Sequence, residues 1–115
     1  MKKILVLTFI VAIVFANCNP SKKIANVPPP KLTYETNLQA VIMANCVPCH
    51  IPAKGGFKKA YDNFTNVKTD IDEMIRRMEL NPTDRGFMPF KKTAKLSDSV
   101  VAVFKQWRAD GLLEK

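Results

Sequence analysis

Apolar residues recur at helical spacing in three stretches of the chain. In the first stretch Thr33 is a suitable N-cap, and Leu38, Val41 and Ile42 then lie three or one residues apart, on one helix face. This pattern predicts a helix that leads up to residue 46. The helix would expose its polar side chains and bury the apolar ones.

The second stretch predicts a helix from Thr69 or Asp70 to Glu79, stopped by Asn81-Pro82. Acidic residues come early in it and arginines late, which is the order that the helix dipole favours. Residues 57–66 mix aromatics with lysines and predict a short helix of their own. The apolar face of the second stretch combines residues at i, i+3, i+4 and i+7, namely Ile71, Met74, Ile75 and Met78.

The third stretch predicts a final helix that Ser97 caps and Gly111 ends. We therefore expect an all-α fold of three to four short helices. The predicted buried stripe of the final helix is Val100, Val103, Phe104 and Trp107.

Residues 1–17 have the pattern of a secretory signal, in which Lys2 and Lys3 precede an apolar run too short for a comfortable membrane span. Cys18 follows Phe15-Ala16-Asn17, which resembles the lipobox of bacterial lipoproteins, although that site usually has Leu in place of Phe15 and Gly or Ala in place of Asn17. We favour lipidation of Cys18; the alternative is an ordinary signal cleaved nearby, with Cys18 left as a free thiol.

Residues 18–31 are polar and contain four prolines, a composition that buries little and stays extended. At about 3 Å per residue in a polyproline-like form, this tether would reach roughly 40 Å. The domain proper is then residues 32–115. The 115-residue chain has a net charge of +8. Since no nucleic-acid motif accompanies that charge, an acidic redox partner or an anionic membrane surface fits it better than nucleic acid does.

The strongest chemical signal is the run Cys46-Val47-Pro48-Cys49-His50. Its Cys-x-x-Cys-His spacing is typical of a covalent attachment site for c-type haem. On a helix, positions three and four apart share a face, so both thiols and the imidazole can be directed at one flat cofactor. Cys46 and Cys49 would form thioethers, and His50 would be the proximal iron ligand.

Two other interpretations of this run stay open. A disulfide or a thioredoxin-like redox pair also suits Pro48, but no convincing pair of alternating strands flanks the motif, as that setting requires. A structural zinc site needs four ligands and would have to recruit Cys18. We favour haem attachment over both.

His50 is the only histidine, so a second histidine ligand from the same molecule is excluded. Of the methionines, one starts the chain, one lies on the helix before the motif, and two belong to the second apolar face. Met88 remains, in a loop predicted over residues 83–96 and held by Pro89. As distal ligand, its soft thioether would raise the reduction potential and leave the iron no open position; the alternative is a methionine that fills a gap in the core.

From Leu32 to Lys115 the sequence resembles the single-haem class I cytochromes c, in particular small bacterial lipoproteins. The attachment motif, the Met88-Pro89 loop and the Ser97-capped last helix carry the resemblance. It implies a cytochrome c fold wrapped around one covalent haem c, with the first and last helices crossing beside it. Where many members have glycine this chain has Leu38, so we expect a wider or shifted crossing filled by Phe104 and Trp107.

We therefore expect an exported electron carrier on the periplasmic side of the cell envelope, anchored to a membrane through Cys18, and not an enzyme. Its partners would be redox proteins, and it would be a monomer or a subunit of a respiratory assembly. A haem sensor or gas-binding domain, and a haem-bearing subunit of a larger redox enzyme, are the alternatives. Lysines that flank the two loops favour an acidic partner, or else form an ordinary solvated surface: Lys54, Lys58, Lys59, Lys91, Lys92 and Lys95.

Overall fold

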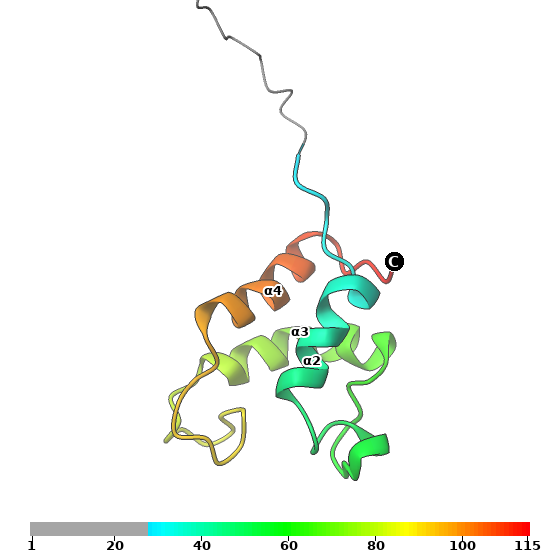
Figure 1. Cartoon of the computed structure of the whole chain (residues 1–115). Coiled ribbons are helices and arrows are strands. Elements are labelled where there is room, and N and C mark those ends of the chain that lie inside the picture. The colour runs from blue at the N-terminus through cyan, green and yellow to red at the C-terminus, as the bar shows by residue number, and fades with distance from the viewer. Residues whose placement is uncertain (1–27) are drawn as a thin grey trace, which may run out of the picture.

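Three α-helices and two short helical segments make up residues 28–115, the part of the chain that the computed structural model describes (Figure 1). No strand occurs among these residues, and their one β-bridge is an isolated parallel pairing of Thr33 with Leu113. The expectation of an all-α fold is therefore confirmed. In chain order the elements are the π-helical segment η1 (Tyr34–Leu38), α2 (Gln39–Asn45), the 3₁₀ turn η2 (Pro52–Lys54), α3 (Phe64–Glu79) and α4 (Asp98–Ala109).

The predicted signal at residues 1–17, Cys18 and most of the predicted tether lie outside the described residues. The last residues of that tether, 28–31, are exposed and carry no regular structure. None of the helices formed by residues 28–115 is both long enough and apolar enough to cross a membrane.

The first helix begins where predicted but with a wider turn. Thr33 is its N-cap, since its side-chain oxygen accepts a hydrogen bond from the Thr36 N–H at 3.3 Å. The Leu38 N–H donates to the Thr33 carbonyl at 3.3 Å, which closes a π-helical turn. This turn passes directly into α2, which ends at Asn45 with Cys46 as its C-cap.

Helix α3 is longer than predicted, and the separate short helix expected within residues 57–66 is wrong. Residues 57–63 are irregular, and α3 begins at Phe64. Asn63 caps it by accepting a hydrogen bond from the Asn66 N–H at 3.0 Å. Burial of Val67 in the core supports this added N-terminal part.

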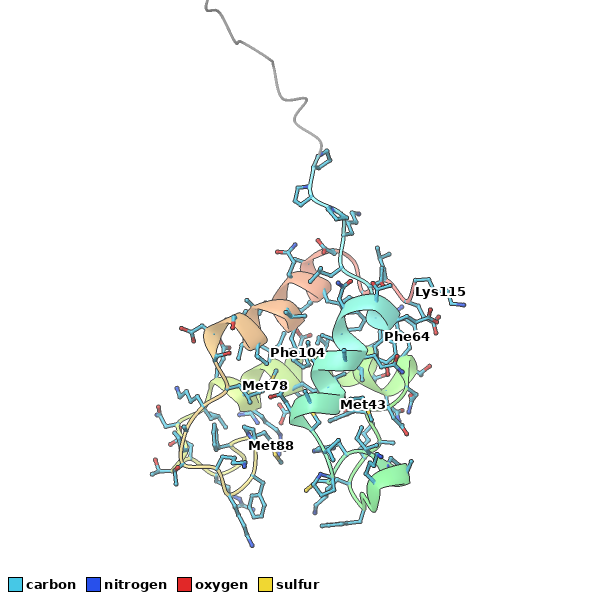
Figure 2. All side chains as sticks on the ribbon, viewed as in Figure 1. Met43, Phe64, Met78, Met88, Phe104 and Lys115 are labelled. Atoms are coloured by element: carbon cyan, nitrogen blue, oxygen red, sulfur yellow. The ribbon has the colours of Figure 1, made fainter. Side chains whose placement is uncertain are left out.

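The core lies where α3 and η1 pack against α4. Leu38, Phe104 and Trp107 are fully buried and belong to one core cluster. Figure 2 shows Phe104 in the interior of the helical assembly. The stripe predicted for the last helix is partly right, because Val100 and Val103 are half-buried. The predicted apolar face of α3 is buried along its whole length: Ile71, Met74, Ile75 and Met78.

A set of hydrogen bonds, here called the terminal clasp, joins residues 32–35 to residues 110–114. The Tyr34 N–H donates to the Leu113 carbonyl at 2.9 Å, and the buried Trp107 Nε1–H donates to the same oxygen at 2.7 Å. The clasp also includes Leu32 N–H to Asp110 Oδ2 at 2.7 Å and Glu35 N–H to the Glu114 carbonyl at 3.0 Å.

Truncation after Leu112 should destabilise the fold, because it removes the acceptors of three clasp hydrogen bonds and leaves the Trp107 indole N–H without its partner. At about 1 kcal/mol for each bond, we expect a loss of roughly 2–4 kcal/mol in the free energy of unfolding. Denaturant titration followed by tryptophan fluorescence measures it. Truncation after Glu114, which removes only Lys115, is the control; equal midpoints for the two truncated chains would contradict the prediction.

Candidate cofactor site

The Cys-x-x-Cys-His motif forms a turn after α2. Residues 46–50 are not on a helix, so the expected sharing of one helix face is wrong. Pro48 lacks the N–H that a continuing helix needs, and α2 ends at Asn45. One hydrogen bond of helical spacing survives, from the His50 N–H to the Cys46 carbonyl at 3.1 Å. The turn thereby holds two half-buried cysteines and a half-buried histidine within five residues of the chain.

A backbone carbonyl fixes the tautomer of His50. Its Nδ1 lies 2.8 Å from the Lys59 carbonyl oxygen, and since a carbonyl only accepts, Nδ1 carries the proton. In the neutral ring Nε2 then keeps its lone pair, the form that binds a metal. No hydrogen bond to Nε2 occurs within residues 28–115. The sequence does not identify which residue supplies this carbonyl, and in the structure it is Lys59.

Residues 58–61, here called the cradle segment, run alongside the motif turn. The Lys58 N–H donates to the Cys49 carbonyl at 3.0 Å, and the Tyr61 N–H donates to the His50 carbonyl at 2.9 Å. The Tyr61 ring stacks on the imidazole, with centroids 4.5 Å apart and planes 14° from parallel. The cradle segment thus contacts His50 through its backbone and through an aromatic face.

Asp70 of α3 receives hydrogen bonds from two side chains of the cradle segment. Lys59 Nζ lies 2.7 Å from Oδ1, and the Tyr61 hydroxyl donates to Oδ2 at 3.0 Å. The hydrogen bond from Lys59, together with that from Tyr61, holds the pKa of Asp70 below its usual value. Burial, and then the bond to Asp70, raises the pKa of the Tyr61 hydroxyl far above its usual value, so it stays a donor.

Gly56 lies in the loop that follows the 3₁₀ turn η2. Its neighbour Gly55 has a left-handed φ of 82°. Gly56, however, lies against the backbone of the motif turn. A Cβ there would lie 2.7 Å from Ile51 N and 2.8 Å from the Cys49 carbonyl oxygen, and closer still to that of Pro48.

The loop that holds Met88 is bonded to α3 at the methionine itself and again at Lys95. The Met88 N–H donates to the Arg77 carbonyl at 3.2 Å, and its neighbour Phe87 is buried. Further along, Lys95 Nζ donates to the Glu79 carbonyl at 2.9 Å. Met88 itself is half-buried. Its position in a loop outside α3, shown in Figure 2, contrasts with the core position of Met78.

The motif turn and the Met88 loop lie at the same end of the domain, away from the point where residue 28 enters (Figure 1). They remain separate segments there, and no hydrogen bond among the described residues joins His50 to Met88. The site residues expected from the sequence are therefore gathered into two segments, one with the thiols and the imidazole and one with the thioether.

Two of the four large exposed hydrophobic residues of residues 28–115 lie next to the cradle segment and in the Met88 loop, respectively. Phe57 is 79% exposed and Phe90 67%, and the ammonium groups of Lys58 and Lys91 lie over their respective rings. The other two large exposed hydrophobic residues are Met43 of α2 and Val47, which directly follows Cys46. A concentration of exposed apolar surface around thiols, imidazole and thioether fits a flat apolar cofactor with a metal centre.

The other interpretations of the motif receive less support from its surroundings. Cys46 and Cys49 are free thiols, and burial raises the pKa of Cys46 to about 11, whereas a thioredoxin-like pair needs a lowered one. Within residues 28–115 no three His, Cys, Asp or Glu side chains are grouped so as to hold a metal ion. Cys18, which a structural zinc site would have to recruit as its fourth ligand, lies outside the described residues.

Comparison of the chain with models of protein families, with curated proteins and with solved structures gave no match.

Replacing Gly56 by alanine should displace the motif turn, because the added methyl group overlaps backbone atoms that cannot rotate away. We expect a loss of roughly 2–3 kcal/mol in the free energy of unfolding. Gly55→Ala is the matched control: its Cβ meets no atom within 4 Å, so only the left-handed φ costs about 1 kcal/mol. Denaturant titration compares the two variants, and the prediction fails if Gly56→Ala is no less stable than Gly55→Ala.

Proposed function

We propose that this chain is a haem protein in which Cys46 and Cys49 hold the porphyrin through thioethers and His50 Nε2 binds the iron. The observation that carries the proposal is the state of His50: Nδ1 is engaged by the Lys59 carbonyl, which leaves Nε2 for a metal, within one turn of two thiols. The exposed apolar side chains beside this turn support a large flat ligand, because its binding would remove them from water.

Met88 is the proposed second axial ligand. Its loop supports this role, because the buried Phe87 and the hydrogen bond from the Met88 N–H to the Arg77 carbonyl hold the backbone at the thioether-bearing residue. A bound haem c would supply a one-electron iron couple. With imidazole and thioether both engaged no position is left for a substrate, so we propose electron transfer rather than bond making. In particular, we propose a single-haem electron carrier of the class I cytochrome c kind, with the cytochrome c fold.

The proposed location is the periplasmic side of the cell envelope. The signal pattern of residues 1–17 and the lipobox-like position of Cys18 support export and anchoring to a membrane. Residue 28 enters the domain at the end opposite the motif turn and the Met88 loop (Figure 1). A tether attached there would leave both segments free to meet a redox partner.

Met88→Ala should change the optical spectrum of the protein produced with haem-maturation machinery. In wild type we expect sharp reduced bands of c-type haem and a weak far-red band from thioether bound to ferric iron. The far-red band should disappear in Met88→Ala, and the reduction potential should fall as the soft ligand is lost. Met43→Ala, which removes a half-exposed thioether from α2, is the control and should keep the band.

Two other outcomes would replace the proposal. A high-spin wild-type spectrum with ready binding of carbon monoxide would favour a haem sensor or gas-binding domain. Absence of covalent haem after expression with the maturation machinery would return Cys46 and Cys49 to the disulfide interpretation.

The surface around the two segments supports an acidic redox partner. Of the lysines that flank them, Lys59 is paired with Asp70 and Lys95 with the Glu79 carbonyl. The remaining four are exposed and stand beside Phe57 and Phe90: Lys54, Lys58, Lys91 and Lys92. Positive charge on the exposed surface of both segments suits a partner with an acidic surface.

Charge reversal of Lys58 and Lys91 together should slow electron exchange with an acidic redox protein about tenfold at low ionic strength, and less at high ionic strength, because salt screens the attraction. Stopped-flow kinetics at two salt concentrations provides the measurement. Lys115→Glu is the control, since Lys115 lies at the opposite end of the domain (Figure 2). Rates that do not depend on salt in wild type would count against this docking surface.

A further inference from the structure

We propose that Asp70 is a positioning residue that fixes the orientation of the His50 imidazole by holding the cradle segment, residues 58–61, against the motif turn. This inference rests on the proposed haem function, in which the orientation and basicity of His50 help to set the reduction potential. Within residues 28–115 the Asp70 carboxylate accepts two side-chain hydrogen bonds, both from cradle residues and neither from His50.

The two cradle residues that contact the imidazole are the same two that bind Asp70. Lys59 accepts the Nδ1–H of His50 with its carbonyl and donates to Asp70 Oδ1 with its ammonium group. Tyr61 covers the imidazole face with its ring and donates to Asp70 Oδ2 with its hydroxyl. One carboxylate thus restrains both the hydrogen-bond acceptor and the stacking partner of His50.

The cradle segment lies between the motif turn and α3. On the side of the turn, Lys58 and Tyr61 donate backbone hydrogen bonds to the Cys49 and His50 carbonyls. On the side of α3, Asn66 Nδ2 donates to the Ala60 carbonyl at 2.9 Å, next to the two bonds of Asp70. The cradle segment, residues 58–61, therefore links the orientation of His50 to the position of α3.

Stability alone does not account for this arrangement. The ion pair between Lys59 and Asp70 is partly exposed, with side-chain exposures of 46% and 22%, and such pairs contribute little to folding. A group that accepts a hydrogen bond from the second ring nitrogen of a metal-binding histidine, in contrast, fixes the orientation of the ring and raises its basicity. A looser bond from Nδ1 to the Lys59 carbonyl would make His50 a weaker electron donor, which favours ferrous over ferric iron.

The test compares Asp70→Asn with Asp72→Asn in the haem-loaded protein. Asp72 lies on the same helix and its substitution makes the same charge change, but Asp72 binds Arg108 of α4 instead of the cradle segment. In Asp70→Asn we expect the Nδ1 proton of His50 to exchange with solvent at least tenfold faster, as followed by NMR of the reduced protein. We also expect its reduction potential to shift upward. Asp72→Asn should leave both quantities near their wild-type values.

Tyr61→Phe separates geometry from charge, because it keeps the stacked ring and removes only the hydroxyl bond to Asp70. It should shift the Nδ1 exchange rate and the potential in the same direction as Asp70→Asn, by a smaller amount. If Asp70→Asn fails to fold, this milder variant decides the question. The inference alone is overturned if Tyr61→Phe and any folded Asp70→Asn take up haem and keep the wild-type exchange rate of the His50 Nδ1 proton and the wild-type reduction potential. If the wild-type chain takes up no haem, the inference and the proposed function both fail.

Discussion

Helix α3 buries one face in the core and uses polar groups to hold both segments of the candidate site. Its apolar face packs toward α4, which fixes the helix in the domain. Asp70, in the first half of α3, binds the cradle segment beside the Cys-x-x-Cys-His turn. The Arg77 and Glu79 carbonyls, near its end, bind the Met88 loop. The spacing between the two segments therefore depends on how α3 packs in the domain, although all the candidate ligands lie outside that helix.

The parts of the fold that the sequence predicts are those governed by local periodicity. The apolar face that contains Met74 and Met78 needs no knowledge of its neighbours, and both methionines are buried as expected. The cap at Thr33 likewise follows from a side chain and an N–H close together in sequence. The start of α3 was misplaced because Phe64 and Val67 have no strong helix propensity, and burial of Val67 in the tertiary structure decides the matter.

In the candidate site, too, some residues can be identified from the sequence and others only from the folded chain. Residue type and spacing are sufficient to single out Cys46, Cys49 and His50, and Pro48 even contains the reason why they lie in a turn. The carbonyl that orients His50 has no sequence signature, because every residue has one and the path of the chain selects which is near. The same holds for Gly56, whose role depends on backbone atoms of a segment that approaches it only after folding.

The terminal clasp determines how a load on the N-terminal side of the domain is distributed. Residues 32–35 run parallel to the C-terminal residues, and their N–H groups bind Asp110, Leu113 and Glu114 at successive points. A pull along the chain from residue 28 would load these bonds together in shear, instead of opening them one after another. The force would then pass into α4 through the Trp107 indole, and α2, which leads to the motif turn, would be spared. Tension at residue 28 would thus be borne by the clasp, at the end of the domain away from the candidate site (Figure 1).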